Sequence, residues 1–410
     1  MTGRRRPGLG GMRVCMVTLS FPRFEGDFAG IFVQGLARGL AGRGLEVVVV
    51  CPHSPAAATR EIVDGVEVRR FRYFLPAGRQ RLAYGSGIAE NLRSSRLAML
   101  QVPLFAAAGS AAVLSASAGA DVIHCFWTLS GLLAAAAVKL RRIPMQLKLL
   151  GSGIRSAPRA ANRVALGCAD AVEIGRGTLE AYLATYDYRG PVLDIHHLPD
   201  YDRVDADEPL EPKLAEWCAG GGELVTYIAR FVPFKDPLGV VRAIPHVLKS
   251  RPDARFLLVG DGPLRAEMET LIDELAIGKS VRLTGARSDV GAILRASTVF
   301  VANSPVTNCY SSCILEAMHA GVPAVVTDAL DPTGSFKQKD YVELARPEDP
   351  PDLARAVVHL LEHPSLRKRR IEMGRQFLAD FGFDREVILD RTIASYERLC
   401  RRSRRAGKRR

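Results

Sequence analysis

Aromatic residues are scarce in this chain: they make up 7% of its 410 residues, whereas glycine and alanine are abundant. This composition suits close β–α–β packing, and 48% hydrophobic with 24% charged residues is typical of a soluble globular protein. The first apolar segment lacks the G-x-G-x-x-G fingerprint, which disfavours a nicotinamide-dependent dehydrogenase. Because a chain of this length exceeds one ordinary core, we expect two domains.

The sequence offers no complete set of metal ligands. Cys309 and Cys313 are four residues apart, but no second pair of cysteines accompanies them. His196 and His197 are not a good metal site either, because adjacent side chains diverge and no third ligand is evident. We therefore expect no metal. Scattered cysteines in apolar contexts and the lack of a secretory signal indicate reduced thiols in a cytoplasmic chain.

The net charge of +12 is concentrated at the two ends of the sequence. Residues 401–410 contribute seven positive charges and residues 4–6 contribute three, so the rest is close to neutral. Tails of this kind are usually disordered and solvated, but they can also attract the anionic headgroups of a membrane surface. Both interpretations stay open. No zinc, ribonucleoprotein or helix-turn-helix motif accompanies the charge, so we expect no nucleic-acid partner.

Residues 97–120 carry no charge and are long enough to suggest a membrane span. They are rich in Ala, Ser and Gly, with Gln101 and Pro103 among them, whereas a spanning segment would be richer in Leu, Ile and Phe. We therefore predict a buried helix.

The most informative stretch covers residues 299–328. It reads as an apolar strand, a turn, a helix that begins near Ser311 and Ser312 and contains Glu316, and a second apolar strand. In a parallel sheet, this order places residues 308–312 at the carboxyl edge, where ligands bind in open α/β sheets. The free N–H groups at the start of the helix favour an anionic or hydroxyl-rich ligand.

The same stretch resembles the family 4 retaining glycosyltransferases, also described as glycosyl transferase group 1. Their signature is a Glu, seven residues, a second Glu and then Ala-Met-Ala-x-Gly-x-Pro-Val-Val. Here Glu316 is the second Glu and is followed by AMHAGVPAVV, while the first Glu position falls on Asn308. The resemblance covers residues 12–399 and is more specific in the second half.

In the first half, residues 12–51 read as strand, glycine loop, amphipathic helix and strand. In the family this loop packs against the donor phosphates and sugar, so Gly30, at the helix start, is a contact candidate. Where the family has His-Gly-x-Asp, this chain reads LGSG from Leu150. Gly151 and Ser152 are therefore candidates for the donor site, and Leu150 replaces the histidine.

The resemblance implies an α/β protein of the GT-B fold, in which two Rossmann-like domains face a cleft and a C-terminal helix crosses back to the N-terminal domain. The implied parts are an acceptor-side domain over 12–205, a nucleotide-sugar domain over 220–383, a crossover helix over 384–400, and basic tails at 1–11 and 401–410.

The resemblance also implies transfer of a glycosyl unit, with retention, from a nucleoside diphosphate sugar to a glycan or lipid-linked acceptor. UDP- and GDP-linked donors are the first expectation, with no further cofactor. Arg230 and Lys235 match a basic pair of the family and would hold the diphosphate. A guanidinium fork and an ammonium at a strand end can stabilise the departing charge without a metal.

Glu316 would accept hydrogen bonds from the ribose hydroxyls, and Asn308 would face the donor sugar. A further set would contact the donor through backbone groups, at the phosphates and sugar or, for Arg287, at the nucleobase: Tyr310, Ser311, Ser312 and Arg287.

Asn308 and Leu150 depart from the family pattern, and they leave other functions open. The protein could bind a nucleotide sugar without catalysis or serve as a scaffold. It could also be a GT-B sugar-nucleotide epimerase, which would consume no acceptor. For a transferase with a lipid-linked acceptor, we expect peripheral contact with the inner face of the membrane through the basic C-terminal tail.

Overall fold

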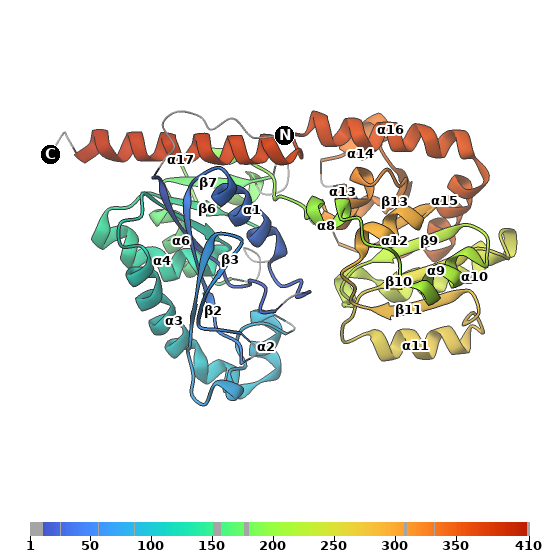
Figure 1. The fold of residues 1–410 in the computed structure, drawn as a ribbon, viewed down its shortest axis with the longest axis horizontal. Coiled ribbons are helices and arrows are strands. Elements are labelled where there is room, and N and C mark those ends of the chain that lie inside the picture. The colour runs from blue at the N-terminus through green and yellow to red at the C-terminus, as the bar shows by residue number, and fades with distance from the viewer. Residues whose placement is uncertain are drawn as a thin grey trace. The chain divides into compact units, whose positions relative to one another are not determined.

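The computed structural model describes residues 11–24, 26–55, 57–85, 87–150, 157–175, 180–306, 310–331 and 333–407. The chain divides into two compact units (Figure 1), namely Met1–Leu198 with Arg385–Arg410, and Pro199–Asp384. Each unit is a parallel sheet covered by helices, which agrees with the predicted α/β class. The division assigns residues 199–205 to the second unit, whereas the sequence placed them in the first.

The first unit is built on an eight-stranded sheet of order β3-β4-β2-β1-β5-β6-β7-β8. Its neighbouring strands are parallel except β3 and β4, which form a hairpin with Asp64 and Gly65 at positive φ in the turn. The strands are β1 (Arg13–Val17), β2 (Glu46–Pro52), β3 (Arg60–Val63), β4 (Val66–Phe71), β5 (Val122–Phe126), β6 (Met145–Lys148), β7 (Ala171–Ile174) and β8 (Val192–Asp194).

The helices of this unit are α1 (Ile31–Gly42), η1 (Ala77–Arg79), α2 (Ile88–Ser94), α3 (Arg96–Ala116), α4 (Thr128–Arg141), α6 (Arg159–Cys168), α7 (Glu180–Ala184) and α17 (Arg385–Gly407). Right-handed crossovers place α1 on one face of the sheet and α3, α4 and α6 on the other. Helix α17 follows the second unit in sequence but belongs to the first. It ends at Gly407 rather than at 400, so residues 401–407 continue a helix, which corrects the expectation of a loose tail from 401 onward.

The second unit is built on an all-parallel sheet of order β11-β10-β9-β12-β13-β14. The strands are β9 (Leu224–Ile228), β10 (Arg255–Val259), β11 (Val281–Gly285), β12 (Val299–Ala302), β13 (Ala324–Thr327) and β14 (Glu343–Ala345). The helices are α8 (Tyr201–Asp205), α9 (Pro212–Ala219), η2 (Pro233–Lys235), α10 (Pro237–Ser250), α11 (Arg265–Glu274), α12 (Val290–Ala296), α13 (Ser312–His319), η3 (Asp328–Leu330), α14 (Ser335–Lys339), α15 (Pro350–Glu362) and α16 (Pro364–Asp380). Short apolar strands such as β12 and β13 are buried on both faces, as in doubly covered parallel sheets.

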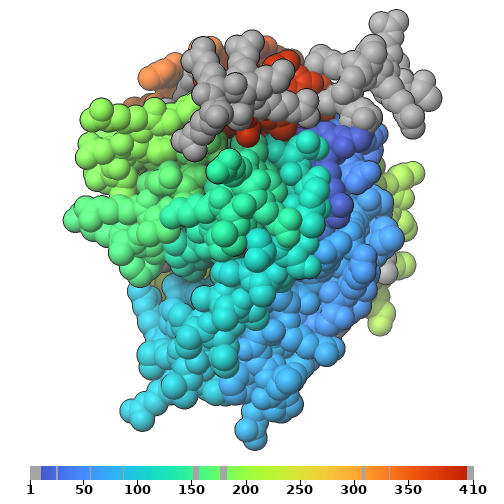
Figure 2. Space-filling model, turned by 90° about the vertical axis from the view of Figure 1, so that its left-hand side faces the viewer, coloured from blue at the N-terminus to red at the C-terminus, as the bar shows by residue number. Residues whose placement is uncertain are grey.

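Helix α3 differs from the buried helix that the sequence predicted. One side packs into the first unit, where the rings of Phe105 and Phe71 lie 5.1 Å apart and Gln101 is fully buried. The other side is open to solvent, with Leu100 at 72% exposure. Figure 2 shows the side of the first unit on which α3 and α4 lie at the surface. Within the described residues, α3 alone is long and apolar enough to cross a membrane.

Candidate functional site

The strand order of the second unit reverses between β9 and β12, which lie side by side and parallel. The chain leaves β9 into residues 229–236 and leaves β12 into residues 303–311, so both loops start at the same edge of the sheet. Such a switch point, at the carboxyl ends of the strands, is where ligands bind in open α/β sheets.

The loop after β9 carries Arg230 and Lys235, which the structure brings together around Phe234. The guanidinium carbon of Arg230 lies 5.7 Å and the Lys235 Nζ lies 6.0 Å from the centre of the Phe234 ring. Arg230 is exposed and has no carboxylate partner among the residues that the structure describes. Partial removal of its hydration lowers the pKa of Arg230. The two cations thus form a concentrated positive site at the strand end.

The loop after β12 holds this basic loop in place. The Asn303 side chain donates to the Asp236 backbone oxygen (3.0 Å) and to its carboxylate (2.9 Å), and the Ser304 hydroxyl donates to the Phe234 oxygen (2.8 Å). The Tyr227 hydroxyl donates to the backbone oxygen of Lys235 (2.7 Å). The sequence interpretation missed Asn303 and Ser304, although two polar residues directly after a buried strand were the available signal.

Helix α13 starts at the same edge. Its N-cap, Ser311, has an extended backbone and caps no N–H with its side chain, so the first N–H groups are not capped by a side chain of the described chain. The Tyr310 side chain is buried against Phe336 and Phe377, and its hydroxyl lies 2.6 Å from that of Thr333. The tyrosine ring is therefore part of the core. The contact with the donor that is predicted for residues 310–312 therefore concerns their backbone groups, as the sequence analysis expected.

Glu316, on the second turn of α13, is 2% exposed. Its carboxylate accepts a hydrogen bond from Arg203 Nη2 at 3.1 Å. Burial raises the pKa of Glu316, and the negative charge of Asp200 adds to the shift, whereas Arg203 and a backbone hydrogen bond from Asp200 oppose it. The carboxylate is therefore desolvated and only partly compensated by its protein partners.

A buried thiol shows how close these charges are. Burial raises the pKa of Cys313 to about 11, Glu316 adds to the shift, and Lys235 and Arg203 oppose it. Cys313 thus lies within electrostatic reach of Lys235 from the β9 loop and of Glu316 from its own helix. The arrangement supplies what a nucleoside diphosphate needs: cations and free N–H groups for the diphosphate, and a carboxylate for hydroxyls.

Arg203 comes from α8, within the segment that the sequence divided between the first domain and a linker. Tyr201 stacks on His319 of α13 with ring centres 4.2 Å apart, and His319 contacts Asp205 at 2.7 Å. These contacts fix α8 against α13 and hold Arg203 at Glu316. No local pattern could predict this pair, because its two residues are 113 positions apart.

Arg287 follows β11, two strands away from β9 in the sheet. Its guanidinium donates two hydrogen bonds of 2.7 Å to Asp289 and one of 3.0 Å to Glu211, and these contacts raise its pKa. The side chain is thus engaged within the protein. The prediction concerned the backbone at this position and stays a prediction.

In the first unit, Gly30 lies directly before α1 with φ +72°. A Cβ atom there would lie 2.1 Å from the Ser20 backbone oxygen, so only glycine fits. This loop follows β1, at the point where the strand order of the first sheet reverses between β1 and β5. The predicted residues Asn308, Gly151 and Ser152 lie outside the described residues, whereas Leu150 is described and half-buried.

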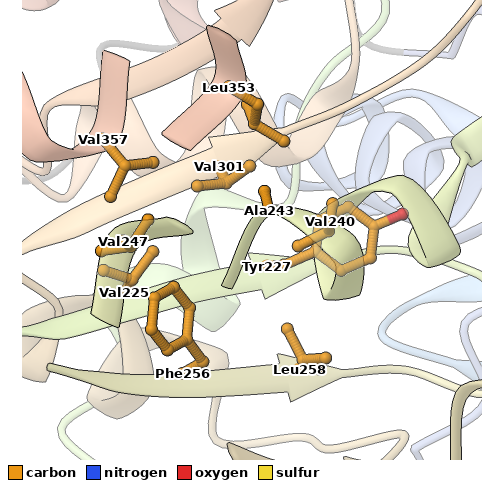
Figure 3. A pocket seen from close by; sticks show the side chains of 10 residues that line it. All are labelled: Val225, Tyr227, Val240, Ala243, Val247, Phe256, Leu258, Val301, Leu353 and Val357. Carbon is orange, nitrogen blue, oxygen red and sulfur yellow. The ribbon is translucent and has the colours of Figure 1, made fainter. Parts of the chain in front are cut away.

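Two further observations concern a small cavity in the core and the side chains that could bind a metal ion. Figure 3 shows a small gap in the core of the second unit, and Tyr227 supplies the one polar atom of its ten lining side chains. That hydroxyl is already bonded to the Lys235 oxygen, so the gap is a packing defect rather than a ligand site. In the described ranges, no group of three His, Cys, Asp or Glu side chains is placed to hold a metal ion.

Comparison with known proteins gives matches to both halves of the chain. Residues 218–377 match the family described as glycosyl transferases group 1, and residues 29–200 match the glycosyl transferase 4-like domain. The chain is 30% identical over 175 residues to the lipopolysaccharide core biosynthesis glycosyltransferase LpsD of Rhizobium meliloti, covering 43% of this chain and 49% of LpsD. It is 30% identical over 215 residues to the 2-deoxystreptamine glucosyltransferase of Streptomyces kanamyceticus, covering 50% and 54%. The chain thus spans about half the length of the curated relatives it matches.

Solved structures show the same fold at low sequence identity. Sucrose-phosphate synthase from Thermosynechococcus elongatus superposes with a TM-score of 0.71 at 21% identity, covering 95% of this chain and 99% of the synthase. Anabaena HepE in complex with UDP and glucose superposes with a TM-score of 0.67 at 17% identity, covering 94% and 99%. Together with the two family matches, these likenesses show that the chain belongs to the group 1, family 4 glycosyltransferases of the GT-B fold.

Proposed function

We propose that this protein transfers a glycosyl unit from a nucleoside diphosphate sugar to a glycan or lipid-linked acceptor, with retention at the anomeric carbon. One observation carries the proposal: Arg230, Lys235 and the start of α13 lie at the switch point of the second sheet. The names of relatives support it, since LpsD is a lipopolysaccharide core glycosyltransferase and HepE was solved with UDP and with UDP-glucose.

In this proposal, Arg230 and Lys235 neutralise the diphosphate as it departs from the sugar. They act from a loop that Asn303 and Ser304 hold rigid, so little reorganisation is needed when charge develops. The N–H groups that begin α13 donate to the phosphates or the sugar. The site itself supplies the charge stabilisation, and the donor is a co-substrate rather than a resident cofactor.

Glu316 binds the ribose hydroxyls in this proposal. The Arg203 guanidinium and the Asp200 backbone N–H already donate to its carboxylate, and the remaining lone pairs can accept hydrogen bonds from hydroxyl groups. A buried carboxylate with unused lone pairs gains more from a ligand hydrogen bond than an exposed one, because water does not compete.

In this proposal, Asn308 faces the donor sugar, because it stands at the first Glu position of the family signature. An amide both donates and accepts hydrogen bonds but carries no charge, so it cannot stabilise positive charge on the sugar as a carboxylate can. We infer that Asn308 and Leu150 retune the choice of donor sugar. A protein that binds the nucleotide sugar without catalysis, and an epimerase, are the alternatives that the experiment below separates.

We also propose that the protein acts in the cytoplasm at the inner face of the membrane. The exposed Arg401 and Arg402 extend the basic end of α17 and are suited to anionic headgroups. A lipid-linked acceptor would be presented at that surface.

The test is calorimetric titration with UDP, GDP and ADP, followed by assays with the matching nucleotide sugars for released sugar and for epimerised donor. Binding of one diphosphate with acceptor-dependent turnover supports the transferase. Binding without turnover, restored by Asn308→Glu, identifies a site that has lost catalysis. Epimerised donor without use of an acceptor identifies the epimerase. Failure of all three diphosphates to bind overturns the proposal.

A further inference from the structure

Two tyrosines and an asparagine form a polar cluster in the first unit. The hydroxyls of Tyr182, on α7, and Tyr186, just after α7, lie 2.8 Å apart, and the centres of their rings lie 5.2 Å apart. The Asn162 side chain, on α6, donates to the Tyr186 hydroxyl at 3.1 Å and to that of Tyr182 at 3.3 Å. Asn162 is fully buried and both tyrosines are half-buried, so a core amide fixes two side chains that reach the surface.

The cluster lies at the same edge of the first sheet as the loop that ends at Gly30. Helix α6 follows β6 and α7 follows β7, and these strands are parallel to their neighbours. Both helices therefore start at the carboxyl ends of the strands, where ligands bind in open α/β sheets. Asn162 is the fourth residue of α6 and Tyr182 the third of α7, so both are close to that edge.

Two arginines accompany Asn162 on α6. Arg159 precedes it by three residues and Arg163 follows it directly, and residues that are three and four positions apart lie on one face of a helix. Both arginines are exposed. Among the side chains that the structure describes, no carboxylate forms an ion pair with Arg159 or Arg163.

The hydrogen bonds of the cluster leave one donor on Tyr186. Bonds from Tyr182 and Asn162 lower the pKa of Tyr186, and the charges of Arg159 and Arg163 lower it further, whereas loss of hydration opposes the shift. The Tyr186 oxygen thus accepts two hydrogen bonds, and its own hydrogen remains for another acceptor. The effect of both charges on this hydroxyl also indicates that the two guanidinium groups are near it.

The groups that remain for a ligand are all donors. A guanidinium has five N–H donors and no acceptor, and the lone pairs of the Tyr186 oxygen are already used. A neutral sugar hydroxyl both donates and accepts, whereas a carboxylate or a phosphate only accepts when it is ionised. The fork of a guanidinium also matches the geometry of both oxyanions.

We propose that Arg159, Arg163 and Tyr186 form a binding site for an oxyanion group, a carboxylate or a phosphate, that the acceptor carries. The site follows from the geometry of the first unit alone. Its assignment to an acceptor rests on the proposed glycosyl transfer, and it narrows the acceptor to an acidic or phosphorylated glycan.

The experiment follows the tyrosine ring signals of the full-length protein by nuclear magnetic resonance after labelling with ¹³C-tyrosine. The ligands are acetate, inorganic phosphate, glucuronate and glucose 6-phosphate, with glucose as the neutral control. We expect saturable shifts of the Tyr182 and Tyr186 signals with the anions and none with glucose. The stronger of the responses to glucose 6-phosphate and glucuronate tells which oxyanion the site prefers.

The test variants are Arg159→Gln with Arg163→Gln, and Tyr186→Phe. The matched control is Arg141→Gln with Arg142→Gln, which removes two exposed charges at the end of α4, just before β6 begins and hence at the opposite edge of the sheet. We expect the first double variant to bind the anions about tenfold more weakly, Tyr186→Phe to lose part of the affinity, and the control to keep it. Circular dichroism reports the folding of each variant.

Absence of saturable shifts with every anion overturns the inference, as does an equal loss of affinity in the control variant. A response to glucose equal to that of the anions also overturns it. UDP titration of the same samples judges the transferase proposal separately. Binding of UDP without binding of the anions would refute only the oxyanion site, whereas the reverse result would leave that site and refute glycosyl transfer.

Discussion

Two buried carboxylates, one in each unit, have opposite surroundings. In the first unit, Glu173 on β7 is surrounded by donors from Lys148, His124 and Gln146. Burial opposes its ionisation, but Lys148 and His124 together outweigh burial and lower the pKa of Glu173 to about 2. In the second unit, Glu316 is equally buried, yet burial prevails and its pKa is raised.

The difference separates a carboxylate that holds the fold together from one that is available to a ligand. The Glu173 network reaches α17, because His124 lies 2.6 Å from the Tyr396 hydroxyl and Gln146 accepts from Ser395 at 2.7 Å. Lys148 and Gln146 both bond to Glu173 itself, so these donors are already used within the first unit. In the second unit, Arg230 is exposed and the Ser311 side chain caps no N–H of α13, so within the described residues these groups are available to a ligand.

The largest effect that we expect comes from Glu173→Gln. The amide keeps the shape but leaves the Lys148 ammonium buried without its counter-charge, which costs about 3–5 kcal/mol of stability. Urea denaturation followed by circular dichroism measures it. The same exchange at Glu316 should cost only about 1 kcal/mol, because its carboxylate is the less compensated of the two. Equal losses at the two positions would contradict the comparison.

The next effect concerns the basic loop of the second unit. Arg230→Ala or Lys235→Ala should weaken binding of the nucleoside diphosphate by about tenfold to a hundredfold, the equivalent of ~1.5–3 kcal/mol for a charged hydrogen bond. Because both side chains border the sheet edge, the urea midpoint should stay nearly unchanged. Arg265→Ala, at an exposed ion pair on α11, is the matched control and should leave affinity intact. If these variants lose stability but keep their affinity for the nucleoside diphosphate, Arg230 and Lys235 are not part of the binding site.

A smaller and more selective effect is expected from Glu316→Gln. This variant should bind the nucleoside diphosphate about tenfold more weakly, since an amide accepts the ribose hydroxyls less strongly than a carboxylate. Inorganic diphosphate has no ribose, so it should bind to this variant as tightly as it binds to the unchanged protein. Calorimetry with both ligands measures the difference, and a parallel loss for both would place Glu316 at the phosphates instead.

The smallest effect is the pH dependence of stability. The pKa of Glu173 is lowered from 4.5 to about 2 by folding, so its contribution is complete above pH ~4.5 and is lost as the pH falls toward 2. Glu316 has the opposite sign, because a raised pKa makes the folded protein bind the proton more tightly, which favours folding as the pH falls. Urea midpoints between pH 5 and 2 should therefore fall less steeply for Glu173→Gln than for the unchanged protein. A steeper fall would show that another acid dominates.

Local patterns in the sequence were sufficient for most of the sheet and for part of the site. The apolar runs at 299–302 and 324–327 coincide with β12 and β13. Arg230 and Lys235 could be singled out because both follow one buried strand, and in the structure they lie 5.7 and 6.0 Å from the centre of the Phe234 ring.

Most features that the sequence analysis missed depend on contacts between distant residues, or on which of two similar helix faces is buried. The Arg203–Glu316 pair and the extension of α17 are fixed by tertiary packing, which local residue patterns do not encode. Helix α3 is apolar all round, so its composition could not show that only one side is covered. The three-residue strand β8 was missed because it is too short to give a periodic signal.

The place of α17 also bears on how the protein is made. Tyr396 and Ser395 complete the polar core of the first unit, although the whole second unit precedes them in the sequence. During translation the second unit is therefore synthesised while His124 and Gln146 still lack these partners. A chain that stops before α17 would keep an unfinished amino-terminal unit together with a complete carboxyl-terminal one.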